Sequence, residues 1–142
     1  MMWSDATKRT PITTVEWMRE AELKHSRFCM LAVLGWVAVD LGLRFPGDMF
    51  AAIPNSLAAH SLAVENGSLK VLLLIVSFLE LMTGAAIFEQ AKGSGRKSGD
   101  FSFDPLNLAN SPAKRKDYEE KEISNGRLAM VSMTSYIATF IL

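Results

Sequence analysis

Apolar residues gather in three blocks along the chain, and polar segments separate these blocks. The middle block, VLLLIVSFLELMTGAAIF at 71–88, contains one charged residue, Glu80. At about 1.5 Å per residue, a helix over this block is about 27 Å long, close to a hydrocarbon thickness of about 30 Å. The first block covers 28–43, and the third covers 128–142 without a charged residue. The pattern predicts an all-α membrane protein with three transmembrane helices.

The polar turns before the first and third blocks continue the helical pattern, so both helices are expected to extend beyond their apolar parts. We expect helices over about 15–43, 69–90 and 112–142, within a single domain over 1–142. The dipeptide Ser111-Pro112 offers a cap and a first-turn proline for the third helix, and RFPG at 44–47 is expected to end the first. The alternative is a soluble helical bundle, whose middle helix would need burial on every face.

Cations are unevenly distributed between the segments that connect the blocks. The segment over 42–68 contains one cation, Arg44. The N-terminal segment and the segment over 91–118 share nine: Lys8, Arg9, Arg19, Lys92, Arg96, Lys97, Lys114, Arg115 and Lys116. Because short segments rich in Lys and Arg stay on the cytoplasm-equivalent side, the N-terminus and the second connection are expected on the same side. A chain with three crossings meets this expectation, because two spans separate the N-terminus from the second connection.

The remaining composition narrows the possible function classes. Fifteen basic residues balance fifteen acidic ones, so the net charge gives no indication of nucleic acid as a partner. Cys29 is the only cysteine, so no internal disulfide is possible, and the sequence has no CxxC pattern or His/Cys cluster to indicate a zinc site. The sequence has no phosphate-binding loop, no dinucleotide fingerprint and no nucleophile with a supporting base. We therefore do not expect an enzyme.

A charged motif is repeated before the first and third apolar blocks. EAELKHSRFCM at 20–30 and EKEISNGRLAM at 120–130 share the pattern E-x-x-[H/N]-x-R at an offset of one hundred residues. With one span between them, the two helices run in the same direction, and the motifs lie at the same membrane depth. The repeat predicts that the first and third helices cross as a pseudo-twofold pair.

In such a crossed pair, Glu22 can face Arg127 while Glu122 faces Arg27. The two ion pairs would close a ring between the helices, and removing one partner of a buried pair costs about 3–5 kcal/mol. The four charged residues are therefore expected to act as a set.

Each motif also contains a polar group that the ion pairs do not need. The glutamates keep free lone pairs after pairing, and so do a neutral His25 and the amide of Asn125. Such groups bind hard or borderline divalent ions, and their separation suggests separate metals with one axial ligand each, as in the magnesium of a chlorin ring. Equally open is a motif that only locks two helices, with His25 and Asn125 hydrogen-bonded in the core.

Glu80 is an ionisable group within a predicted membrane span, where such groups are usually functional. Its apolar block contains no Lys, Arg or His. It must therefore bind a cation, find a partner on another helix, or be protonated and donate to a backbone carbonyl.

The two repeated motifs resemble those of the light-harvesting chlorophyll-binding proteins, and most of all the chlorophyll a/c proteins of red-lineage plastids. FDPLNLA at 103–109 is similar to the family's FDPLGLA before the third helix, and DLGLRFPG at 40–47 also matches this branch. The resemblance covers 16–140. Asn107 stands where the family usually has glycine, and Thr139 where it commonly has a glutamine ligand.

The resemblance implies a set of pigment sites. Its chlorophyll ligands are Glu22, His25, Glu80, Glu122 and Asn125, which bind magnesium axially, with Arg27 and Arg127 as structural ion-pair partners. Asp104 and Pro105 belong to a clamp for the carotenoid. The implied cofactors are chlorophyll a, chlorophyll c and a carotenoid, namely fucoxanthin, peridinin or a related xanthophyll.

The resemblance further implies an antenna that passes excitation energy to a photosystem, and WMREAELKH at 17–25 favours photosystem I. The implied location is the plastid thylakoid membrane, with a stromal N-terminus, and the partners are thylakoid lipids, photosystem core subunits and neighbouring antenna proteins. The alternatives are a photoprotective quencher, a proton or ion relay through Glu80, Glu22 and His25, and a structural subunit. His60, Glu89 and Gln90 are interpreted as surface groups.

Overall fold

A computed structural model describes residues 12–141, and the expected cations Lys8 and Arg9 and the terminal Leu142 lie outside this part. The described residues form helices and no strands. The helices are α1 (Thr14–Asp40), α2 (Asp48–Ala51), α3 (Ser56–Glu65), α4 (Ser68–Ala91) and α5 (Pro112–Ile141). The three long helices lie over the three ranges expected to be helical, and α2 and α3 lie in the connecting segment over 42–68.

Both ends of α1 are determined by local contacts. At its start, the Thr13 side chain accepts a hydrogen bond from Glu16 N at 3.2 Å, and Glu16 Oε2 accepts one from Thr13 N at 2.7 Å. The helix ends at Asp40, so the expected end at Leu43 and the role given to RFPG are wrong. Gly42 adopts a left-handed φ of 87°, which favours glycine and turns the chain out of the helix.

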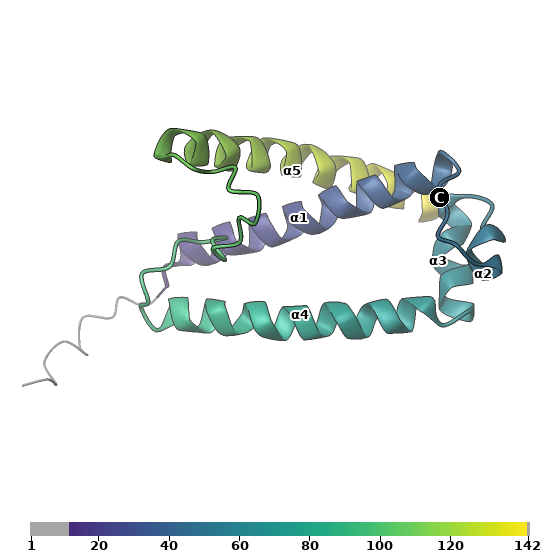
Figure 1. Cartoon of the computed structure of the whole chain (residues 1–142), viewed down its shortest axis with the longest axis horizontal. Helices are drawn as coiled ribbons and strands as arrows, with labels where there is room; N and C mark the ends of the chain where they lie inside the picture. Colours follow the sequence, from purple (N-terminus) through teal and green to yellow (C-terminus); the bar gives the residue numbers. More distant parts are fainter. Residues whose placement is uncertain (1–11, 142) are drawn as a thin grey trace, which may run out of the picture.

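The segment between α1 and α4 is attached to the end of α1 by two charged residues. Asp40 accepts hydrogen bonds from the backbone N and the hydroxyl of Ser56, both at 2.9 Å. Arg44 donates to the carbonyl oxygens of Ile53 at 2.9 Å and Pro54 at 3.2 Å. These contacts place α2 and α3 across one end of the long helices (Figure 1).

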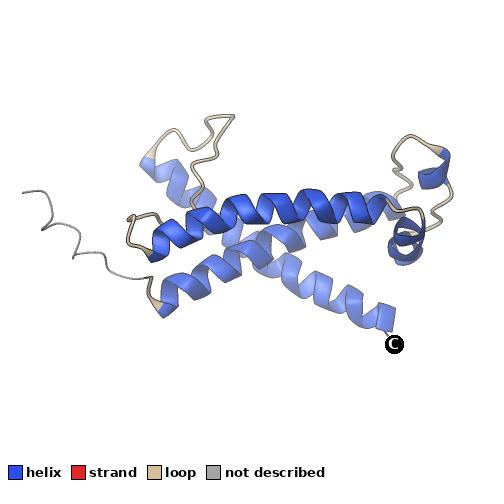
Figure 2. Cartoon of the chain, turned by 90° about the horizontal axis from the view of Figure 1, so that it is seen from below, coloured by secondary structure: helices blue, strands red, loops and turns tan. Residues whose placement is uncertain are grey.

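The two helices α1 and α5 cross, and α4 runs along the other side of α1 (Figures 1 and 2). The small core at the crossing includes Leu23, Ile123 and Ser26, all of them buried. Ser26 lies against Gly126, where an added Cβ would stand 2.4 Å from Ser26 Cβ. Only glycine at position 126 therefore permits this close approach.

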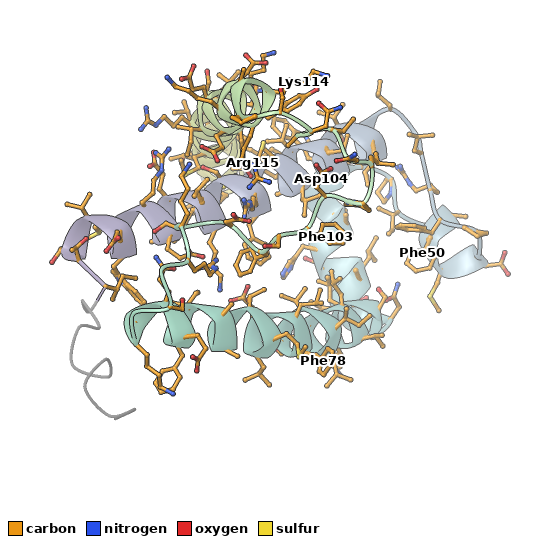
Figure 3. All side chains as sticks on the ribbon, turned by 60° about the vertical axis from the view of Figure 1, so that its left-hand side comes forward. Phe50, Phe78, Phe103, Asp104, Lys114 and Arg115 are labelled. Carbon is orange, nitrogen blue, oxygen red and sulfur yellow. The ribbon has the colours of Figure 1, made fainter. Side chains whose placement is uncertain are left out.

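Within residues 12–141, α4 is the one helix long and apolar enough to cross a membrane by length and composition. No residue over 71–88 is buried by the rest of the protein. Figure 3 shows Phe78 on the outer side of α4, where its side chain is 63% exposed. The first halves of α1 and α5 carry the charged motifs, and these charges lower their average hydropathy.

Candidate functional site

Two arginine–glutamate pairs join α1 to α5 at their crossing. Arg27 Nε lies 2.7 Å from Glu122 Oε1, and Arg127 Nε lies 2.8 Å from Glu22 Oε1. These are the two contacts expected from the repeat. Arg19 adds a contact that the sequence analysis missed, with Nη1 3.0 Å from Glu22 Oε2. Its signal was the i, i+3 spacing of opposite charges on one helix.

His25 and Asn125 lie beside the ion pairs, and both residues are exposed. The Nδ1 of His25 lies 2.7 Å from the carbonyl oxygen of Ala21. Because a carbonyl can only accept, Nδ1 carries the hydrogen, and in a neutral imidazole Nε2 then keeps its lone pair. The alternative in which both side chains are hydrogen-bonded in the core is wrong, since neither is buried.

Glu80 has a partner on another helix. Lys24 Nζ of α1 donates to Glu80 Oε2 of α4, and both side chains are partly buried. Of the three possibilities left open for Glu80, the structure shows a partner on another helix.

The candidate ligands do not combine into a single metal site. Among the described residues, no three His, Cys, Asp or Glu side chains lie close enough together to hold one metal ion. The candidate donors therefore stand apart from one another: His25 and Asn125 are exposed, whereas Glu22, Glu80 and Glu122 are partly buried in ion pairs. This arrangement fits magnesium that already has four ligands in a ring and needs one axial ligand.

The FDPLNLA segment forms a tight turn before α5. Asp104 Oδ1 and Oδ2 accept hydrogen bonds from the backbone N of Leu108 at 3.0 Å and Ala109 at 2.9 Å. The Ala109 and Leu108 backbone donors hold the pKa of the Asp104 carboxyl below its ordinary value. Asn107 has a left-handed φ of 50°, so this asparagine keeps the conformation that glycine favours. Pro105 precedes it in the turn, exposed to solvent.

A groove of about 1050 Å³ lies between α1, the loop before α5 and the first half of α5. Asp104 lines this groove, whereas Pro105 does not. The floor includes Leu23, Met30 and Ile123, and the loop contributes Phe101 and Phe103. Figure 3 shows Phe103 and Asp104 on the loop that runs below α5.

A buried cluster that the sequence analysis missed holds the loop against α1. Arg96 Nη2 lies 3.2 Å from Glu20 Oε1, with side chains 13% and 3% exposed. Glu20 Oε2 also accepts from Gly99 N at 2.6 Å. Gln90, interpreted from the sequence as a surface group, is buried here and donates to Ser98 Oγ at 3.1 Å. No short-range sequence pattern predicts these contacts, because Glu20 and Arg96 are 76 residues apart.

The other residues considered have ordinary surroundings. His60 is exposed on α3, and Glu89 lies 3.3 Å from Lys92 at the end of α4. The Thr139 hydroxyl donates to the carbonyl oxygen of Tyr136 at 2.7 Å, within α5. The Tyr136 ring also contacts Trp36, with centroids 4.2 Å apart.

Comparison with known proteins finds related sequences over nearly the whole chain. The family described as chlorophyll A-B binding protein matches residues 2–140. Fucoxanthin-chlorophyll a-c binding protein A of Phaeodactylum tricornutum is 32% identical over 82% of the chain and 61% of its own length. Light-harvesting complex stress-related protein 1 of Chlamydomonas reinhardtii is 30% identical over 84% of the chain and 51% of its own length.

A further relative is photosystem I chlorophyll a/b-binding protein 5 of Arabidopsis thaliana, which is 33% identical over 87% of the chain and 55% of its own length. The chain thus spans between about half and three fifths of these curated relatives.

Proposed function

The chain belongs to the chlorophyll A-B binding protein family, and from this membership we propose that it is a light-harvesting antenna of the plastid thylakoid membrane. It binds chlorophylls and carotenoids and transfers excitation energy to a photosystem, without making or breaking covalent bonds. The observation that carries this proposal is the pair of crossed arginine–glutamate contacts, each of which lies beside an exposed His25 or Asn125.

Five side chains serve as axial ligands to chlorophyll magnesium: Glu22, His25, Glu80, Glu122 and Asn125. The free lone pair at His25 Nε2 supports this role, because Nδ1 is held by the Ala21 carbonyl. At the glutamates, the pairing cations cancel the negative charge while a carboxylate lone pair stays available. Bound chlorophyll supplies the light-absorbing ring, and the residues fix its position.

Three helices, α1, α4 and α5, cross the membrane in one domain over 1–142, with a stromal N-terminus. The exposed apolar second halves of α1 and α5 support this, including Leu31 and Leu34 in one helix and Leu128 and Val131 in the other. A pseudo-twofold axis between α1 and α5 is supported by two contacts between residues one hundred apart. These are Ser26 with Gly126 and Trp36 with Tyr136.

The groove beside the FDPLNLA turn holds the carotenoid, with Asp104 and Pro105 shaping its end. Its volume and the apolar part of its lining, with Leu23, Met30 and Ile123, support a hydrocarbon ligand. The pigments are chlorophyll a, chlorophyll c and fucoxanthin, peridinin or a related xanthophyll; of these, the name of the Phaeodactylum relative contains fucoxanthin and chlorophyll a-c. The partners are thylakoid lipids, photosystem core subunits and neighbouring antenna proteins.

Photosystem I is the favoured energy acceptor, in line with the name of the Arabidopsis relative. Photoprotective quenching is the second candidate function, because the stress-related Chlamydomonas protein is about as similar as the fucoxanthin protein. A proton or ion relay has less support, since Glu80, Glu22 and Glu122 are all held in ion pairs.

Absorption and fluorescence-excitation spectra of the protein, purified in mild detergent, test the proposal. We expect red chlorophyll absorption bands and carotenoid excitation that produces chlorophyll emission. Strong carotenoid absorption with a short chlorophyll fluorescence lifetime would favour quenching instead. A colourless and well-folded helical protein would contradict both pigment functions.

A further inference from the structure

We propose that Lys24 is a positioning residue that enables Glu80 of α4 to bind chlorophyll magnesium, an inference that rests on the proposed function. The Lys24–Glu80 contact is the one direct hydrogen bond or ion pair between α1 and α4 among the described residues. Lys24 occupies an x position of the repeated motif E-x-x-[H/N]-x-R, so the motif itself does not require a lysine there.

The first argument is charge. A carboxylate at membrane depth needs a compensating cation, and the glutamates at the crossing have Arg27 and Arg127. Glu80 has no cation in its own apolar block over 71–88. Lys24 supplies that charge from α1.

The second argument is the use of the two carboxylate oxygens. Lys24 Nζ contacts Glu80 Oε2, and Oε1 accepts no hydrogen bond from the described residues. The ammonium group is a compact charge, and here it contacts only one of the two carboxylate oxygens. The single contact thus neutralises Glu80 and leaves an oxygen for a metal. The Glu80 side chain is 42% exposed, so a ligand can approach it from outside the protein.

The third argument is the break in the repeat. Leu23 and Ile123 are both buried, and Ser26 and Gly126 meet at the crossing. The residues on either side of position 24 in α1 therefore occupy the same places as those on either side of position 124 in α5. Position 24, however, is lysine in α1, whereas its counterpart is Ser124 in α5. This difference between the two motifs agrees with the position of α4, which lies beside α1 on the side away from α5 (Figure 1). Only the helix that faces α4 carries the extra cation.

The test measures the chlorophyll-to-protein ratio of purified complexes by pigment extraction and chromatography. We expect Lys24→Met to lose about one chlorophyll per chain, and Glu80→Ala to lose the same one, with the same missing band in the absorption difference spectrum. Lys24→Arg is expected to retain it, because the cation remains. The matched control is Lys70→Met, a change at an exposed cation of α4 without an ion-pair partner among the described residues.

A double variant, Lys24→Met with Glu80→Gln, separates charge compensation from a merely structural contact. The amide of glutamine is a neutral ligand that needs no cation, so this variant is expected to recover the chlorophyll that Lys24→Met loses. If Lys24→Met does not assemble, the double variant decides alone: a full complement supports the inference, and failure to recover it overturns it.

The experiment distinguishes failure of the proposed Lys24 role from failure of the proposed antenna function. A pigmented wild type whose Lys24→Met variant keeps every chlorophyll overturns the role of Lys24 and leaves the antenna function intact. A wild type without chlorophyll overturns the antenna function, and this inference with it.

Discussion

At the scale of single residues, the crossing of α1 and α5 depends on its smallest side chains. Ser26 is completely buried, and its neighbour Gly126 leaves no room for a Cβ. The two motifs can come close enough for arginine and glutamate to meet because nothing larger stands between the helices. Helices in membranes pack in this way through small residues, since water does not drive them together.

Replacing Gly126 by alanine is therefore expected to force α1 and α5 apart. The added Cβ would overlap Ser26 Cβ and Oγ, and we expect a loss of about 1–3 kcal/mol in stability. Thermal unfolding in detergent, followed by helical circular dichroism, measures this loss. Adding Ser26→Gly to the same chain should recover most of it.

Gly35→Ala is the matched control, because a Cβ at Gly35 meets nothing within 4 Å. Alanine there should be neutral or slightly stabilising, since glycine within a helix costs about 0.5–1 kcal/mol relative to alanine. Equal losses at both glycines would show that the crossing does not require the close approach.

Sequence reasoning reached the residues of the crossing and missed others for a physical reason. Glu22 and Arg127 could be paired because the repeat itself relates the two helices. The partners of Glu20 and Glu80, by contrast, are Arg96 and Lys24, and no repeat relates those segments. Their contacts depend on where α4 and the following loop lie, which the sequence pattern does not specify.

At the scale of elements, the helix ends follow local chemistry. Leu43 N bonds to Ala38 O and Gly42 N to Val39 O after α1, and the same pattern recurs after α4 around Gly93. The long helices were predictable because block length and caps such as Ser111 are local signals. The helices α2 and α3 were missed because they are short and held by distant contacts, such as that of Asp40 with Ser56.

The turn before α5 should depend on the ionisation of Asp104. Its pKa is lowered in the folded protein by backbone donors, so its contribution to stability is complete above the unfolded pKa of about 3.9. The contribution is lost as the pH falls through the lower folded value. Amide hydrogen exchange at Leu108 and Ala109, corrected for intrinsic pH dependence, should show protection lost in that acidic range.

In Asp104→Asn, the side chain has one acceptor oxygen in place of two. We expect weaker protection of Leu108 and Ala109 at neutral pH and no further change on acidification. Acid-induced loss of the same size in both proteins would assign the effect to another group.

At the scale of the whole molecule, α4 is attached differently from α5. The helices α1 and α5 share a buried crossing and two ion pairs, whereas α4 is held to α1 by Lys24–Glu80 and by connections at its ends. Its apolar side chains are exposed along the whole span. In the proposed antenna, pigments and lipids would cover these side chains.

Removal of pigments is therefore expected to loosen α4 while α1 and α5 stay together. Spin labels at Leu31 with Leu74, and at Leu31 with Leu128, in a Cys29→Ser background, report the two helix separations. Upon pigment extraction in detergent, the α1–α4 distance distribution should broaden and the α1–α5 distribution should not. Equal broadening of both would show that the crossing also depends on pigment.

The long separation of paired charges has a consequence for biogenesis. The partner of Lys24 comes 56 residues later, that of Arg27 comes 95 residues later, and that of Glu22 at the crossing comes 105 residues later. A chain that has inserted only its first helix carries cations whose partners are still outside the bilayer, at a cost of up to about 2.5–3.5 kcal/mol each. Insertion of α4 and α5 therefore removes a charge cost that the first helix carries while it is alone in the bilayer.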